Sequence, residues 1–415
     1  MRGDCAVSPR RGDGSCYTDA IFAILHAWNR PALMSYLYID TPDALTELCA
    51  KLQHSPWLTL DTEFIREKTY YPELCLIQIA NDEIVACVDP LVLKDLSPLL
   101  DLLYDPKITK VLHAARQDLE ILQQLRGVPP ATIFDTQIAA TLLGQGEQVG
   151  YGNLVKLVVN VELDKAHSRT DWAQRPLSSE QLEYAADDVR YLRDVYLQQR
   201  QKLEQLGRLS WLDEDFAQLS DPALYAPPLD EIWTKLKGLN RLKGVQLAMV
   251  QKLAEWREGL ARERNLPRRW LLNDDLLIEL ARQRPLSEDK LRRIRGMDDK
   301  LIQRHGKIML QLLEEARSMP PEQWPQLEER PRLSAQQDAL VDVLTGVVKL
   351  CAAQHQLSAN ALASRKELEQ LLSGNPQAPL LHGWRHELCG HTVEGLLSGK
   401  QCITIEAERV HISDV

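Results

Sequence analysis

Long apolar runs, paired cysteines and an overall excess of positive charge are all missing from this 415-residue sequence. No stretch approaches the roughly 18 apolar residues that a transmembrane helix needs, so we predict no contact with a membrane. The 8 cysteines are scattered without paired spacing, which indicates reduced thiols in a cytoplasmic protein. The formal net charge of −10 argues by itself against nucleic acid as a partner.

The N-terminal 33 residues differ from the rest of the chain. A short apolar run at 20–28 follows Arg10 and Arg11, as in a secretion signal, but it contains His26 and lacks a small-x-small cleavage site. We therefore predict that residues 1–33 are an extension outside the fold, consistent with an upstream start codon.

Composition otherwise describes an ordinary globular protein, with 44% hydrophobic and 26% charged residues, and the length allows two or three domains. Charge is unevenly distributed, because residues 235–310 contain 19 Lys and Arg but only 10 Asp and Glu. This basic region is either a solvated helical surface or a surface that binds nucleic acid.

A group of histidines near the C-terminus raises the question of zinc. His382, His386, Cys389 and His391 lie close together in the sequence. No second ligand pair at zinc-finger spacing accompanies them, and histidines are common at helix ends and turns. The sequence therefore does not predict a zinc site at these histidines.

Two carboxylates lie near the end of the stretch 57–64, which begins as an apolar run. In a strand, Asp61 and Glu63 point to one face and Thr62 to the other. At about 4 Å and an effective dielectric near 20, two such charges repel by roughly 4 kcal/mol, so they require a raised pKa or a cation. Hard oxygen ligands favour Mg²⁺ or Mn²⁺. Taken alone, an Asp-x-Glu strand is more often a solvated sheet face.

Strands and helices alternate after this run, which predicts a mixed sheet flanked by helices. The expected strands are 57–64, 74–79, 84–88, 110–115 and 132–134. The expected helices are one starting at Thr41 and those at 96–104, 117–125, 135–143 and 178–203.

Further acidic side chains lie at the ends and faces of these helices. Asp118 lies in the first turn of a helix that follows a strand. At such a junction it can line a ligand-binding site, or it can simply stabilise the helix by interacting with the helix dipole. Tyr184 and Asp188 are four apart on the long helix and share one face, as Asp187 also does with Tyr184. A phenol beside a carboxylate can orient a water. Asp135 lies where a helix cap belongs.

These residues match a known pattern. Asp61-x-Glu63, Asp118 and Tyr184-x-x-x-Asp188 resemble the three exonuclease motifs of the tyrosine-bearing DEDD superfamily. The stretches 69–72, 112–114 and 168–177 resemble bacterial ribonuclease D in particular. The resemblance covers residues 35–317, and the family pattern selects Asp188, not Asp187, as the ligand.

The resemblance implies a 3′-5′ exoribonuclease that releases nucleoside 5′-monophosphates. Asp61, Glu63, Asp118 and Asp188 would hold two divalent ions, Mg²⁺ or Mn²⁺, about 4 Å apart. Tyr184 would position the attacking water. The implied substrate is RNA with a free 3′ end, in particular tRNA precursors, and no obligate protein partner is inferred.

Other residues are candidates for holding the RNA, by stacking on bases or by contacting phosphates. They are Tyr70, Tyr71, His113, Arg169, Trp172, Arg262, Arg268 and Arg293. The alternatives are a DNA-directed 3′-5′ exonuclease, which would use the same acids, and a nucleic-acid-binding protein without catalysis.

The predicted fold class is α/β, a ribonuclease H-like mixed-sheet exonuclease domain followed by one or two all-α HRDC-type domains. The residues that resemble the helical HRDC module are Trp256-Arg257, Asn265-x-Pro267, Ile294-x-Gly296 and His305-Gly306-Lys307. Prolines mark two breaks in the chain. The expected divisions are an exonuclease domain at 34–205, a linker at 206–229, an HRDC domain at 230–318, a linker at 319–333 and a helical, second HRDC-like domain at 334–415.

Overall fold

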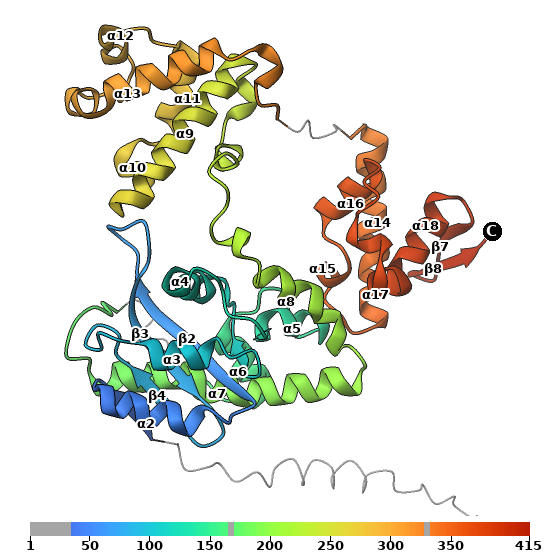
Figure 1. Cartoon of the computed structure of the whole chain (residues 1–415). Coiled ribbons are helices and arrows are strands. Elements are labelled where there is room, and N and C mark those ends of the chain that lie inside the picture. The colour runs from blue at the N-terminus through green and yellow to red at the C-terminus, as the bar shows by residue number, and fades with distance from the viewer. Residues whose placement is uncertain (1–34, 165–169, 328–332) are drawn as a thin grey trace, which may run out of the picture.

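The computed structural model describes residues 35–164, 170–327 and 333–415 (Figure 1). The predicted extension at 1–33 therefore lies outside the described residues. Within the described part, none of the helices is long and apolar enough to cross a membrane.

Six strands of the described chain form one mixed sheet in the order β1-β4-β3-β2-β5-β6. Strands β2, β3 and β4 are an antiparallel meander, whereas β1 pairs parallel to β4, β5 to β2, and β6 to β5. Their bounds are β1 Tyr36–Ile39, β2 Trp57–Ile65, β3 Glu73–Ala80, β4 Val85–Val88, β5 Thr109–Leu112 and β6 Ile133–Asp135. The predicted meander and mixed α/β sheet are confirmed.

Strand β1 was not expected from the sequence. It has only four residues, and its pairing with β4 brings Tyr36 opposite Val85 and Ile39 opposite Val88. A strand this short carries too little alternation to be recognised, and here it is fixed by a partner almost 50 residues away.

Helices cover both faces of the sheet, as Figure 1 shows. Helices α2, α3 and α4 pack on the face that carries Leu60, and α7 packs on the other face. The Thr59 hydroxyl donates a 3.0 Å hydrogen bond to the Val189 carbonyl of α7. Because side chains alternate along a strand, Asp61 and Glu63 share the face of Thr59 and therefore point towards α7.

Five helices of this part of the chain begin and end close to where the sequence predicts, whereas the helix at 151–159 was not predicted. Their bounds are α2 Pro42–Leu52, α3 Ser97–Leu103, α4 Arg116–Arg126, α5 Thr136–Leu142, α6 Tyr151–Val159 and α7 Ser179–Gln205. Helix α7 starts with a capping box, in which Ser178 and Gln181 each bond to the other's backbone N–H. This cap fixes the start of α7 and hence the direction of every side chain on it.

A second group of helices has a core of its own (yellow to orange in Figure 1). Its elements are η3 Ile232–Lys235, η4 Leu239–Arg241, α9 Val245–Arg264, α10 Arg268–Leu271, α11 Asp274–Gln283, α12 Glu288–Arg292, α13 Asp299–Ser318 and η5 Pro321–Gln323. Leu253, Leu277 and Leu313 are fully buried in this core. It corresponds to the helical module expected from the periodicity.

The third group begins with helices but does not end with one. It contains α14 Ala335–Gln354, α15 Ala359–Leu362, α16 Arg365–Leu372, η6 Pro379–Leu381, α17 Gly383–Arg385, the π-helical turn η7 His386–Gly390, α18 His391–Leu397, β7 Gln401–Glu406 and β8 Arg409–Asp414. The expectation of an all-helical segment from 334 to 415 is therefore wrong at its end. Ala407 and Glu408 both have positive φ, which suits a two-residue hairpin turn between β7 and β8.

This third group packs against the sheet domain. One apolar cluster contains Trp57 and Phe134 from the sheet together with Val347 of α14. The rings of Trp211 and Trp384 stack with centroids 4.5 Å apart and planes 4° from parallel. The C-terminal group thus shares a core with the sheet domain.

The segment 206–229, predicted as a linker, takes part in that shared core. It contains η1 Leu209–Leu212, α8 Asp213–Leu219 and η2 Pro222–Leu224, and Leu212 is fully buried. Arg208 donates a 2.6 Å hydrogen bond to the His355 carbonyl. The acids and prolines suggested a loose connection, but the apolar side chains between them give its first half a packed position.

Candidate active site

The strand β2 and the helix α7 bring three carboxylates together. Oxygens of Asp61, Glu63 and Asp188 all lie within 4.8 Å of one another. Asp61 and Glu63 face α7 because they alternate with Leu60, and the capped start of α7 turns Asp188 towards them. The resemblance to the DEDD exonucleases implied this meeting of two segments that are more than 120 residues apart.

Asp118, in the first turn of α4, lies outside this group of three, but it is near enough to raise the pKa of Asp61 and of Glu63. One of its oxygens accepts a 2.5 Å hydrogen bond from the Thr62 hydroxyl. Thr62 points away from α7, as the alternation predicts, and so reaches the face on which α4 lies. Thr62 is thus a partner of Asp118 that sequence reasoning missed, although its position between the two acids was visible.

Burial raises the pKa of every carboxylate in this group. The pKa of Asp61 lies well above its usual value, first because of burial and then because of Asp118 and Asp188. Burial, followed by Asp188 and Asp118, raises the pKa of Glu63 to about 8. Burial raises the pKa of Asp118 to about 7 and that of Asp188 to about 8. Such a group is costly to ionise unless a cation joins it.

Tyr184 lies one turn before Asp188 on α7. Burial, and then Asp188, Glu63 and Asp61, raise the pKa of its hydroxyl, so Tyr184 keeps its proton near neutral pH. Its ring packs against Trp172, with centroids 6.2 Å apart. The side chain of Trp172, a candidate for substrate binding, is only 3% exposed. Trp172 therefore supports Tyr184 and has almost no surface left for a base.

Asp187, the neighbour that shares the helix face, is held elsewhere. It pairs with Arg190, which also binds Glu183 at 2.7 Å. Its backbone carbonyl accepts a 2.8 Å hydrogen bond from the Tyr151 hydroxyl. Burial, followed by Asp188 and Asp61, raises the pKa of Tyr151, so this ring lies close behind the carboxylates. No local pattern in the sequence singles out Tyr151.

Asp135 has the structural role that the sequence predicts. It is the N-cap of α5 and accepts a 2.8 Å hydrogen bond from the Gln137 N–H. It also accepts from the N–H groups of Ala114 at 3.1 Å and Ala115 at 2.9 Å. Asp135 thereby fixes the turn that leads into α4 and to Asp118.

His113, proposed to steer bases, is already engaged inside the protein. Its Nε2 lies 3.0 Å from the Val149 carbonyl and its Nδ1 lies 3.0 Å from the Thr136 hydroxyl. Because a carbonyl only accepts, Nε2 carries the proton. Burial lowers the pKa of the ring, which favours the neutral form of His113.

The tip of the β2–β3 hairpin contacts the second helical group. The backbone N–H groups of Tyr70 and Tyr71 both donate to the Asn265 side-chain oxygen at 3.0 Å. The Tyr70 hydroxyl hydrogen-bonds to Glu258 of α9, and the Arg268 guanidinium lies 5.4 Å from the Tyr70 ring centre. The structure thus engages Tyr70 in a contact between two parts of the chain.

Two candidate arginines belong to the same contact. Arg262 and Arg268 bind the buried carboxylate of Glu258 at 3.3 and 2.6 Å. Arg293, in contrast, is exposed after α12. Arg169 lies outside the described residues.

A cavity of about 460 Å³ opens beside the carboxylates. Tyr184 and Asp188 line it together with Glu183 and Asp187. An RNA phosphate entering this acidic surface needs cations to offset the repulsion. The site can therefore act on a phosphodiester only with metal ions present.

Comparison with known protein families identifies the class of enzyme to which the chain belongs. A family model described as 3′-5′ exonuclease matches residues 36–204, and one described as HRDC domain matches 246–313. Fold and site together define a 3′-5′ exonuclease with an attached HRDC domain, a class whose members depend on divalent metal.

Individual relatives narrow the class to one family. Ribonuclease D of Gluconacetobacter diazotrophicus is 40% identical over 375 residues, which cover 90% of this chain and 95% of that protein. Ribonuclease D of Bartonella henselae is 39% identical over 382 residues, which cover 91% of this chain and 92% of that protein. The crystal structure of Escherichia coli RNase D has 36% identity and a TM-score of 0.77, covering 88% of this chain and 99% of that one. The chain belongs to the ribonuclease D family and is a 3′-5′ exoribonuclease.

Proposed function

We propose that Asp61, Glu63, Asp118 and Asp188 hold two divalent ions, Mg²⁺ or Mn²⁺, and that the enzyme trims the 3′ ends of tRNA precursors. The observation that carries the metal site is the approach of three half-buried carboxylates to within 4.8 Å of one another. Carboxylates with raised pKa values at this distance form a stable anionic group only around a cation.

The donor set suits the proposed ions. All four side chains offer hard oxygen ligands, which Mg²⁺ and Mn²⁺ prefer. Bound divalent ions supply charge stabilisation to the attacking and leaving oxygens of phosphodiester hydrolysis. Thr62 holds Asp118 in a fixed direction, as a hydrogen-bonding partner does for a metal ligand.

Tyr184 is the group we assign to the attacking water. Its protonated hydroxyl lies on the turn before Asp188, and its ring is supported by Trp172. A hydroxyl at this place can hold a water in line with the scissile phosphate without itself giving up a proton. The products would be nucleoside 5′-monophosphates.

The RNA substrate follows from the family and from the charge distribution. The similar protein of Escherichia coli is described as an exoribonuclease involved in structured RNA processing. Residues 235–310 carry 19 basic and 10 acidic residues, which favours contacts with the phosphates of a folded RNA. tRNA precursors in the cytoplasm combine a folded body with a single-stranded 3′ end. In this proposal an exonuclease domain at 34–205 acts beside an HRDC domain at 230–318 and a C-terminal domain at 334–415.

The test uses a tRNA precursor with a label at its 5′ end, incubated with enzyme and Mg²⁺. We expect stepwise shortening that stops near the mature 3′ end. A DNA oligomer of matched sequence tests the DNA-directed alternative, which uses the same carboxylates. Faster degradation of the DNA would overturn the RNA assignment, and no degradation of either would indicate a binding protein without catalysis.

A further inference from the structure

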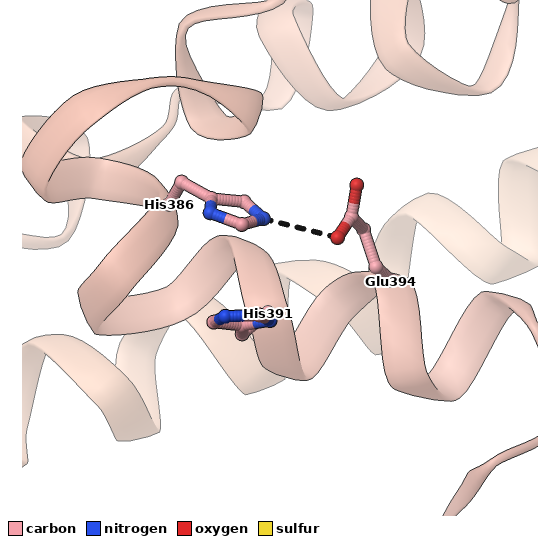
Figure 2. A group of neighbouring side chains, drawn as sticks. All are labelled: His386, His391 and Glu394. Carbon is pink, nitrogen blue, oxygen red and sulfur yellow. Dashed lines mark hydrogen bonds and ion pairs between the residues drawn. The ribbon is translucent and has the colours of Figure 1, made fainter.

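A second group of side chains with metal-ligand atoms lies in the C-terminal part of the chain, outside the active site. Atoms of His386, His391 and Glu394 that can bind a metal all lie within 4.8 Å of one another. The His386 Nε2 is 3.0 Å from a Glu394 oxygen, and the two imidazole centres are 4.4 Å apart. Figure 2 shows His386 and Glu394 facing each other, with the ring of His391 beside the line that joins them.

A local irregularity of the helix brings the two histidines together. Residues five apart in an α-helix lie about 140° apart around the axis, so they point in different directions. Here His386–Gly390 form a π-helical turn, in which the His391 N–H donates to the His386 carbonyl. This wider turn carries both imidazoles to one side, and such turns are frequent at functional sites.

Gly390 keeps this turn in place. A Cβ atom added at Gly390 would lie 2.2 Å from the Leu380 carbonyl oxygen and 2.7 Å from Cδ2 of His386. Only glycine therefore allows the turn to pack against Leu380 with the His386 ring in its observed direction. The arrangement of the histidines is built into the packing of the backbone.

The cluster differs from the one considered in the sequence. His382 is turned away, with its Nε2 3.0 Å from the Pro376 carbonyl, and Cys389 is fully buried in the apolar core. Glu394, three residues after His391, takes part instead. Two of the four residues that are close in sequence thus point away from the cluster, and its third member is a glutamate. The spacing of histidines and cysteines therefore matched no zinc motif.

We infer that His386, His391 and Glu394 form a binding site for a transition-metal ion, filled by Zn²⁺. Two imidazole nitrogens and one carboxylate are ligands that suit Zn²⁺, whereas Mg²⁺ prefers oxygen alone. Three protein ligands leave the fourth tetrahedral position to solvent.

The distances agree with this assignment. Ligand atoms about 2.05 Å from a tetrahedral ion lie about 3.3 Å from each other. The 3.0 Å between the His386 Nε2 and the Glu394 oxygen is already close to this value. His391 is exposed, so a rotation of its side chain can bring its ring nitrogen to the same distance from the other two ligand atoms. A bound ion would cross-link the π-helical turn to α18.

Zinc titration of the full-length chain, followed by calorimetry, tests the site. Excess Mg²⁺ is kept present so that the carboxylates around Asp61 are occupied. We expect one Zn²⁺ per chain, with affinity at least tenfold weaker in His391→Gln and in Glu394→Gln. His382→Gln is the matched control, because it removes a nearby exposed imidazole outside the cluster, and it should bind as the unchanged protein does.

A second measurement needs no substitution and so does not depend on folding of the variants. Diethylpyrocarbonate modifies accessible imidazoles, and mass spectrometry locates the modified residues. Zn²⁺ should protect His386 and His391 but leave His382 reactive. Equal modification with and without Zn²⁺, or unchanged Zn²⁺ affinity in both variants, would show that His386 and Glu394 form an ion pair only.

Discussion

The hydroxyl of Tyr70 hydrogen-bonds to the carboxylate of Glu258, and this contact joins the exonuclease sheet to the helical HRDC region. Glu258 is fully buried and is balanced by Arg262 and Arg268. The two guanidinium partners and the phenol stabilise this buried carboxylate. The hairpin tip therefore serves to hold α9 against the sheet domain.

Replacing Tyr70 by phenylalanine should loosen this junction. The change removes a hydrogen bond to a charged group, which contributes about 1.5–3 kcal/mol. We expect faster proteolytic cleavage in the connecting segment around residues 220–245, with the circular dichroism spectrum unchanged. Tyr71→Phe is the control, since among the described residues Tyr71 hydrogen-bonds through its backbone only. Equal cleavage rates in both variants would contradict the role of Tyr70.

Removal of divalent metal should abolish RNA hydrolysis, and Mg²⁺ or Mn²⁺ should restore it. Asp61→Asn or Asp188→Asn should also abolish hydrolysis, because each removes a proposed ligand. In EDTA these variants should melt at the same temperature as the unchanged protein or higher, since each relieves repulsion within the cluster. Full activity in either variant would remove that residue from the mechanism.

Tyr184→Phe separates water positioning from metal binding. The substitution deletes one hydroxyl and leaves the ring that packs on Trp172. Turnover should fall about 10²-fold, as expected for loss of a positioning group. Mg²⁺ affinity, measured by calorimetry, should stay within about twofold. A large loss of metal affinity would mean that Tyr184 supports the ligands instead.

The metal-free protein should lose stability as the pH rises. The folded pKa values are about 7 for Asp118 and about 8 for Glu63 and Asp188, whereas unfolded carboxyls titrate near about 4. Between these values the folded state holds more protons than the unfolded state, so the free energy of unfolding decreases with pH. Melting in EDTA should therefore occur at a lower temperature at pH 8 than at pH 5, and Mg²⁺ should reverse the difference. Higher stability at pH 8 in EDTA would contradict the raised pKa values.

The basic helical region can be tested by charge removal. Arg293→Ala combined with Arg295→Ala removes two exposed charges. If these residues contact RNA phosphates, the salt dependence of tRNA-precursor binding should weaken by roughly two counterions. Arg292→Ala is the control, because Arg292 is already paired with Asp289 at 2.9 Å and Asp299 at 3.3 Å. Identical salt slopes in all three proteins would show a merely solvated surface.

Point substitutions test RNA binding by the basic helical region better than truncation of the chain near Pro227 does. Such a cut would also remove α14 and the residues after it, which share an apolar core with Trp57 and Phe134. The shortened protein would expose that core, and any loss of activity would be ambiguous. This constraint was invisible in the sequence, where residues 206–229 look like a simple connection.

The sequence by itself determined the parts that depend on local pattern. Alternation along residues 57–64 placed Asp61 and Glu63 on one face and Thr62 on the other, and helical spacing placed Tyr184 one turn before Asp188. The cap position of Asp135 was equally readable. These features follow from periods of 2 and 3.6 residues, which neighbouring residues fix without long-range contacts.

Only the tertiary structure decided what distant segments do to one another. His113 and Tyr70 looked like groups that contact RNA, but Val149 and Glu258 hold them, and no local pattern announces either partner. His386 and His391 meet because packing of Gly390 against Leu380 maintains a π-helical turn. Long-range packing selects such partners and turns from many that local propensity allows, and the sequence alone therefore leaves them open.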